Sequence, residues 1–106
     1  MTLIEPFRII MLNEAYGDLK SIYDFIAEES PDAAADMVDR ILASIDLLKV
    51  FPHRYAIEFS YRGLPKQVRS LPVQPYVVYF RVLDRERVVR ILTIRHSARR
   101  RPRRFA

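Results

Sequence analysis

The stretch LPVQPYVVYFRVLDRERVVRILTIRHSARRR, residues 71–101, decides the fold. Its middle run, residues 76–83, opens with YVVYF, which is apolar throughout and typical of a central strand covered on both faces. The runs 67–73 and 87–95 are also rich in β-forming residues, and the polar turn 84–86 separates the last two runs. Short turns favour antiparallel neighbours, so this half predicts a small, mainly antiparallel sheet.

The first half predicts one strand followed by two helices. Residues 7–12, FRIIML, form a short and bulky apolar run that is typical of a mostly buried strand. Asn13 then offers a side-chain oxygen that could cap a first helix, which we expect to reach about Glu29. Ser30 and Pro31 form a restart signal, because Ser caps helices and Pro is tolerated at the first helical position. The second helix should stop at Val50 or Phe51, because Pro52 forbids continuation.

Both helices carry an apolar stripe at helical spacing. The stripes are Ala15, Leu19, Ile22 and Ile26 in the first helix, and Ala34, Val38, Ile41, Ile45 and Leu48 in the second. The connection between the helices is short enough to require an antiparallel hairpin. The predicted fold class is therefore α+β, in which an N-terminal strand and an antiparallel helical hairpin pack on the sheet. Residues 51–66 are interpreted as an irregular excursion with room for one extra short strand.

Length and composition predict a single domain over residues 1–106, in which 97–106 form a basic C-terminal tail. The chain has no cysteine, which excludes disulfides and thiolate metal sites and fits a reducing compartment. Charged residues interrupt any signal-like run near the N-terminus, so we expect a cytoplasmic protein. The two histidines lack metal-ligand spacing and the two glycines cannot build a phosphate loop, so no metal or cofactor is expected.

Charge is distributed unevenly along the chain. Residues 1–50 hold four Lys or Arg and ten Asp or Glu, a net charge of −6, whereas residues 51–106 hold fourteen and three, a net charge of +11. A basic half this concentrated raises the local concentration of anionic molecules and speeds encounter with them. The partner could be a nucleic acid or an acidic protein.

Residues 71–101 resemble the C-terminal hairpin of the ParE/RelE toxin superfamily. In that family a Tyr-containing strand, a tight polar turn and a second strand lead into a His that is followed shortly by Arg. The first half is similar in the order and spacing of three motifs. These are Ala-x-x-Asp-Leu (Ala15, Asp18, Leu19), Ser-Pro (Ser30, Pro31) and Ile-x-x-Leu-x-x-x-Pro (Ile45, Leu48, Pro52).

Within the superfamily the resemblance favours the ParE branch, whose members are taken to poison DNA gyrase, over the RelE branch, whose members cut messenger RNA on the ribosome. RelE-like strands carry Arg where this chain has Tyr76, and RelE-like nucleases place a Tyr near the C-terminus, where this chain ends in Phe105 and Ala106. The run His96-Ser97-Ala98-Arg99 resembles a ParE-like His-Gly-x-Arg ending, with Ser97 in place of Gly.

The resemblance implies a toxin of a type II toxin–antitoxin system that inhibits gyrase and is neutralised by a ParD-like antitoxin, with which it forms a hetero-oligomer. The alternative is a RelE-like, metal-independent endoribonuclease. Its candidate groups are His96 as acid or base, and Arg69, Arg95 and Arg99 as cations around the phosphate. A third class, a plain nucleic-acid-binding module, rests on the basic half alone.

The candidate residues for binding the target or the antitoxin lie in the last three strands and just after them. They are Arg69, Tyr79, Arg81, Leu92, Ile94, Arg95, His96 and Arg99. We expect Arg69 to be paired or to lie on an open face, because an unpaired charge among apolar neighbours is costly. We also expect the sheet face away from the helices to be incompletely covered at Tyr79, Leu83, Leu92 and Ile94. Such a surface suits an apolar and acidic segment that folds on binding.

Overall fold

A computed structural model describes residues 5–60 and 67–98 of the chain. The elements in order are β1 (Arg8–Met11), α1 (Asn13–Ala27), α2 (Pro31–Asp46), the 3-10 turns η1 (Leu47–Lys49) and η2 (Pro52–Arg54), β2 (Ile57–Ser60), β3 (Gln67–Val73), β4 (Tyr76–Leu83) and β5 (Val88–His96). The predicted tail therefore lies outside the described residues from position 99 onward, as does the end of the predicted excursion, residues 61–66. The extra strand expected in that excursion is β2.

The five strands form one sheet in the order β1-β5-β4-β3-β2. β4 is the middle strand, as its apolar run predicts, and Val78 and Phe80 within it are fully buried. The β2–β3, β3–β4 and β4–β5 pairs are antiparallel, whereas β1 pairs with β5 in parallel. The prediction of a small, mainly antiparallel sheet is therefore confirmed.

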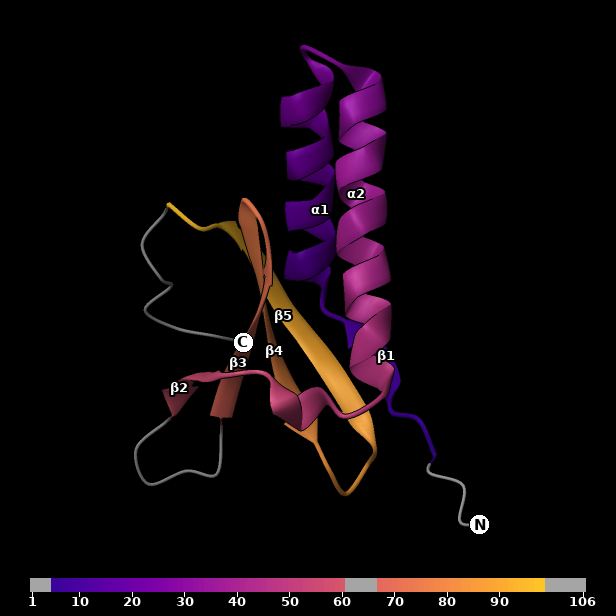
Figure 1. Ribbon diagram of the computed structural model, residues 1–106, viewed down its shortest axis with the longest axis vertical. Helices are drawn as coiled ribbons and strands as arrows, with labels where there is room; N and C mark the ends of the chain where they lie inside the picture. The colour runs from indigo at the N-terminus through magenta and orange to yellow at the C-terminus, as the bar shows by residue number, and fades with distance from the viewer. Residues whose placement is uncertain (1–4, 61–66, 99–106) are drawn as a thin grey trace.

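The two helices form an antiparallel hairpin that covers one face of the sheet and extends beyond its upper edge (Figure 1). α1 packs on β5 and α2 packs on β3. Most members of the predicted stripes join alternate residues of the strands in the main core. The prediction is wrong at Val38, which stays half-buried while its neighbour Met37 belongs to the core. The most deeply buried residues of the main core are Ala15, Ile41, Leu48, Val78, Phe80, Val89 and Ile91. Among residues 5–60 and 67–98, no helix is both long enough and apolar enough to span a membrane.

The helix ends differ from one another in how they are capped. Ser30 caps α2 as predicted, because its Oγ accepts a hydrogen bond from the Ala33 amide at 3.1 Å. The predicted Asn13 cap of α1 is wrong. Leu12 is the N-cap residue and its amide donates to the Ile91 carbonyl of β5 at 3.0 Å, which holds Leu12 extended and lets the helix begin at Asn13.

The second helix ends earlier than expected. α2 stops at Asp46 and the chain continues as η1, so the prediction of a helix to Val50 or Phe51 is wrong. Phe51 has a φ of 50° and a ψ of 54°, the left-handed region that non-glycine residues rarely adopt. This reversal turns the chain out of the helical direction just before Pro52, and it leaves the Phe51 side chain 59% exposed.

The opposite face of the sheet is more closed than expected, because β5 carries one extra residue. The β4–β5 register shifts between Tyr79 and Phe80, whose partners are Thr93 and Ile91, so Leu92 is left unpaired as a bulge. The bulge places Ile94 in the core on the helical side. Tyr79, Leu92 and Ile94 are only 7%, 0% and 3% exposed. The expected apolar opening at these three residues is therefore wrong, and only Leu83 stays half-buried.

Candidate functional site

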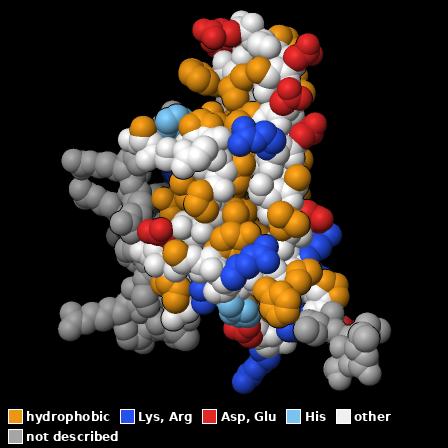
Figure 2. Space-filling view, in the orientation of Figure 1, with side chains coloured by type: hydrophobic (Ala, Val, Ile, Leu, Met, Phe, Trp, Pro, Cys, Tyr) orange, Lys and Arg blue, Asp and Glu red, His pale blue; other side chains and the backbone are white. Residues whose placement is uncertain are grey.

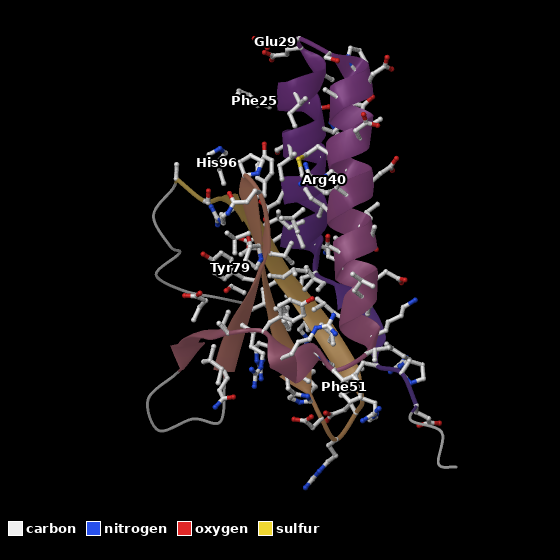
Figure 3. The ribbon with its side chains drawn as sticks, viewed as in Figure 1. Phe25, Glu29, Arg40, Phe51, Tyr79 and His96 are labelled. Atoms are coloured by element: carbon white, nitrogen blue, oxygen red, sulfur yellow. The ribbon has the colours of Figure 1, made fainter. Side chains whose placement is uncertain are left out.

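A groove of about 580 Å³ lies between α1 and the ends of β4 and β5. Its walls are mostly apolar, and its polar groups come from one face of α1 and from the end of β5. The lining residues are Asp18, Ser21, Ile22, Phe25, Tyr76, Ile94, Arg95, His96 and Ala98. Figure 3 shows Phe25 on the hairpin above His96 at the upper end of the sheet. Phe25 is 72% exposed, so an aromatic ring stands at the rim with most of its surface in water.

Asp18 joins α1 to β5 at the floor of this groove. Its Oδ2 accepts hydrogen bonds from the Thr93 hydroxyl at 2.5 Å and from the Ile94 amide at 2.9 Å. β1 has ended at this point, so the carboxylate satisfies a β5 amide that no strand partner reaches. The Thr93 hydroxyl also accepts a bond from Arg95 Nε at 3.2 Å, which orients that guanidinium beside the groove.

His96 lies at the end of β5, opposite Tyr76 in the β4–β5 register. The two rings make an edge-to-face contact with centroids 5.4 Å apart. The His96 Nδ1 accepts a hydrogen bond from the Ala98 amide at 3.1 Å, so in this arrangement Nδ1 carries no proton and Nε2 is the nitrogen that can donate from a neutral ring. The side chain is half-buried and belongs to the groove wall.

Arg69 lies at the other end of the sheet and is paired, which is one of the two alternatives expected for it. Its Nη1 donates to the backbone carbonyls of His53 at 2.9 Å and Tyr55 at 2.8 Å. Arg69 is opposite Phe80, whereas His96 is opposite Tyr76, so four residues of β4 separate the two positions. At about 3.4 Å per residue they lie roughly 14 Å apart along the strand direction alone. The structure therefore does not bring Arg69 and His96 together.

Two other ionisable side chains of the second half have partners of their own. Glu58 accepts a hydrogen bond from the Ser70 hydroxyl at 2.8 Å. His53 is exposed, and its Nε2 lies 2.6 Å from an Asp84 carboxylate oxygen. Within the described part of the chain, no group of three His, Asp or Glu side chains could hold a metal ion.

Arg81 is not part of the groove and lines a small cavity of about 90 Å³ with His53, Arg69 and Asp84. It is opposite Arg90 of β5 in the register, and both side chains are half-buried. Nothing local in the sequence marks Arg90, because a pair of facing arginines is visible only once the strand register is known. The Ala-x-x-Asp-Leu motif marks the position of Asp18 but not its role, which depends on bonds to residues far along the chain. Arg99 lies outside the described residues.

Charge separates the molecule into two regions. Figure 2 shows acidic side chains along the upper part of the hairpin and hydrophobic surface in the hollow between hairpin and sheet. In the described residues the arginines after position 50 lie on the sheet and its connecting turns. The uneven distribution of charge along the sequence therefore corresponds to an acidic hairpin that lies beside a cationic sheet.

Almost the whole chain is similar to known proteins. Residues 9–101 match the family described as "ParE toxin of type II toxin-antitoxin system, parDE". A protein of Caulobacter vibrioides named "Toxin RelE2" is 33% identical over 93 residues, which cover 87% of this chain and 97% of that protein.

Solved structures with the same fold include a chain of the structure described as "Chromosomal ParDE TA system from P. aeruginosa". The match has a TM-score of 0.68 and 26% identity, and covers 85% of this chain and 95% of the other. A chain of the archaeal RelE–RelB complex of Pyrococcus horikoshii has a TM-score of 0.62 at 18% identity, covering 90% and 99% of the two chains. At that identity the second likeness concerns the fold alone.

Proposed function

Because the chain belongs to the ParE toxin family of type II toxin–antitoxin systems, within the ParE/RelE superfamily, we propose that it is a ParE-like toxin that inhibits DNA gyrase by binding. A cognate, ParD-like antitoxin neutralises the toxin by binding to it. The toxin itself performs no bond-breaking step in this proposal, and its surface alone carries the activity.

The separation of His96 from Arg69 is the observation that carries this proposal. A metal-independent nuclease needs an acid or base and a cation around the same phosphate. Here Arg69 is committed to two backbone carbonyls, and His96 lies at the opposite end of the sheet. The two side chains named for cleavage therefore do not surround one phosphate, whereas inhibition by binding does not require them to lie close together.

The contact residues divide by accessibility. Arg81, Arg95 and His96 keep half-buried side chains that a partner can reach. Tyr79, Leu92 and Ile94 are almost fully buried, so in the proposal they hold the strands in place and do not contact the partner. Arg69 holds the turn that follows η1 in place.

The charge pattern and the structural likeness support an antitoxin as partner. The P. aeruginosa structure is a ParDE system, and the cationic sheet of this chain suits a partner segment with acidic side chains. The groove beside Phe25 supplies apolar surface for the same segment. A segment of this kind orders itself on binding and can cover both surfaces.

A RelE-like endoribonuclease is the second candidate, because His96 and Arg95 line the same groove. The C. vibrioides relative also bears the name RelE2. This version of a nuclease site would use Arg95 in place of Arg69.

Expression of the chain from a tightly controlled promoter separates the two functions. A gyrase inhibitor is expected to induce the DNA damage response while messenger RNA ends stay unchanged, and the purified chain should block supercoiling by gyrase. The His96→Gln variant should remain toxic. Early cleavage of messages that His96→Gln abolishes, with supercoiling unaffected, would overturn the proposal in favour of the nuclease.

A further inference from the structure

Two arginines face each other across the middle of the sheet. Arg81 of β4 and Arg90 of β5 are direct partners in the antiparallel register. Side chains alternate between the two faces of a strand, and the neighbours Phe80, Val89 and Ile91 all join the core under the helices. Arg81 and Arg90 therefore point together from the face that the hairpin does not cover.

Neither guanidinium has a partner among residues 5–60 and 67–98. Arg69, Arg87 and Arg95, in contrast, each donate a hydrogen bond to a protein oxygen. The ion pairs of the described residues involve other side chains, and no hydrogen bond or ring contact reaches Arg81 or Arg90. Within the described residues no ion pair or hydrogen bond neutralises the two arginines, and the Asp84 carboxylate that lines a cavity with Arg81 is paired with His53.

This arrangement works against the stability of the sheet. Like charges directly opposite each other in an antiparallel pair destabilise it, and partial burial reduces the screening by water. A third arginine, Arg8 of β1, lies nearby, because its Cα partner Val88 is two residues from Arg90 on the same face of β5. Three arginines thus lie on one face of three neighbouring strands, and a bound anion would reduce the repulsion between their charges.

We propose that Arg81 and Arg90 form a clamp for an acidic side chain of the protein that neutralises this toxin, with Arg8 at its rim. The inference rests on the proposed function, because it names the contact through which the antitoxin binds. One carboxylate between two guanidinium groups accepts charge-assisted hydrogen bonds from both, which are the stronger class of hydrogen bond. The positive charges of the two arginines are then balanced only in the complex with the antitoxin.

The surroundings of the pair favour a carboxylate on a protein over a phosphate on a nucleic acid. Ile10, the β1 partner of Arg90, is 40% exposed, so the clamp adjoins apolar surface that suits a peptide. Proteins that bind single strands combine cations with exposed aromatic rings on which bases stack. The aromatic rings of α1 that are most exposed, Tyr16 and Phe25, belong to the helical layer on the other side of the sheet.

The decisive test compares Arg81→Glu and Arg90→Glu with Arg85→Glu, a matched change at an exposed turn arginine. Each variant is expressed with and without the product of the adjacent gene, and growth and the affinity of the purified pair are measured. We expect Arg90→Glu to arrest growth as the natural chain does and to escape neutralisation, and we expect both clamp variants to bind the gene product at least about 30-fold more weakly. Arg85→Glu should be neutralised normally.

A second measurement uses the purified chain alone and guards against misfolded variants. Arg90→Gln removes the repulsion, so its melting temperature should rise by roughly 1–5 °C. Succinate, as a carboxylate probe, should stabilise the natural chain and have a smaller effect on Arg90→Gln. Equal melting temperatures and equal succinate effects would overturn the clamp even if the Glu variants failed to fold.

The other outcomes also decide the question. Unchanged affinity for the adjacent gene product overturns the clamp and leaves the proposed function standing. Loss of toxicity with intact binding assigns the pair to the toxin's target instead. Salt-sensitive binding of a short oligonucleotide that Arg90→Gln abolishes assigns it to nucleic acid. If the natural chain neither arrests growth nor binds the gene product, the proposed function itself fails, and the clamp fails with it.

Discussion

The Asp18 carboxylate of α1 accepts the backbone amide of Ile94 in β5 at 2.9 Å, across 76 positions of the sequence. The bond ties the helical hairpin to the strand that carries Arg95 and His96. It also replaces a strand partner at the point where β1 no longer runs beside β5. The relative placement of the groove walls therefore depends on one carboxylate.

Replacing Asp18 should destabilise the fold. Asp18→Ala leaves the Thr93 hydroxyl and the Ile94 amide without their acceptor, and hydrogen bonds to charged groups contribute about 1.5–3 kcal/mol each. We expect the free energy of unfolding to fall by about 2–3 kcal/mol in urea titrations. Asp24→Ala, on the same helix in an exposed pair with Lys20, should change it by less than about 0.5 kcal/mol. Equal effects of the two substitutions would contradict a special role for Asp18.

Arg69 should prove structural and not part of the target surface. Arg69→Ala removes two hydrogen bonds to the carbonyls of His53 and Tyr55 and should lower the free energy of unfolding by about 2–3 kcal/mol. The proposed inhibition of gyrase should be unchanged per folded molecule, which supercoiling assays measure while circular dichroism gives the folded fraction. A fully stable Arg69→Ala protein that no longer inhibits would instead place this side chain on the target.

The left-handed backbone at Phe51 predicts an unusual stabilising change. Glycine adopts this region without the steric cost that a Cβ brings, which is about 1 kcal/mol. Phe51→Gly should therefore be more stable than Phe51→Ala by roughly 1 kcal/mol in thermal or urea unfolding, because both variants lose the same exposed ring. The reverse order would mean that residue 51 is not left-handed in solution.

The cap of α2 predicts a smaller loss. Ser30→Ala removes the acceptor of the Ala33 amide and should lower the free energy of unfolding by about 1 kcal/mol. Ser21→Ala, in the exposed middle of α1, should leave stability unchanged or slightly higher, since Ala is the better helix former. Asn at position 30 should restore most of the loss, and failure of that rescue would argue against capping as the cause.

Local signals in the sequence predict several of the helices and strands. Strands 67–73 and 76–83 are found at their predicted bounds, and the Ser30–Pro31 restart marks the start of α2. These predictions depend on neighbouring residues only: side-chain volume, the fixed φ of proline and the capping oxygen of serine. They held because no distant contact competes with them at these positions.

What could not be predicted depends on contacts between residues far apart in the sequence. Nothing near Leu92 signals a bulge, which exists only in relation to the β4 partner and which reverses the facing of Ile94. Asn13 failed as a cap because Ile91, far along the chain, holds Leu12 extended. The facing of Arg81 and Arg90 is likewise a property of the register.

The parallel pairing of β1 with β5 joins the chain's first described strand to its last, since Arg8 is the partner of Val88, 80 positions later. During synthesis on the ribosome, residues 8–11 emerge early and stay unpaired until residues 88–91 have been translated. A prematurely terminated product lacks that neighbour and leaves the nascent edge strand without its hydrogen bonds. The sheet therefore cannot gain its β1 strand until the ribosome has translated the chain past Val88.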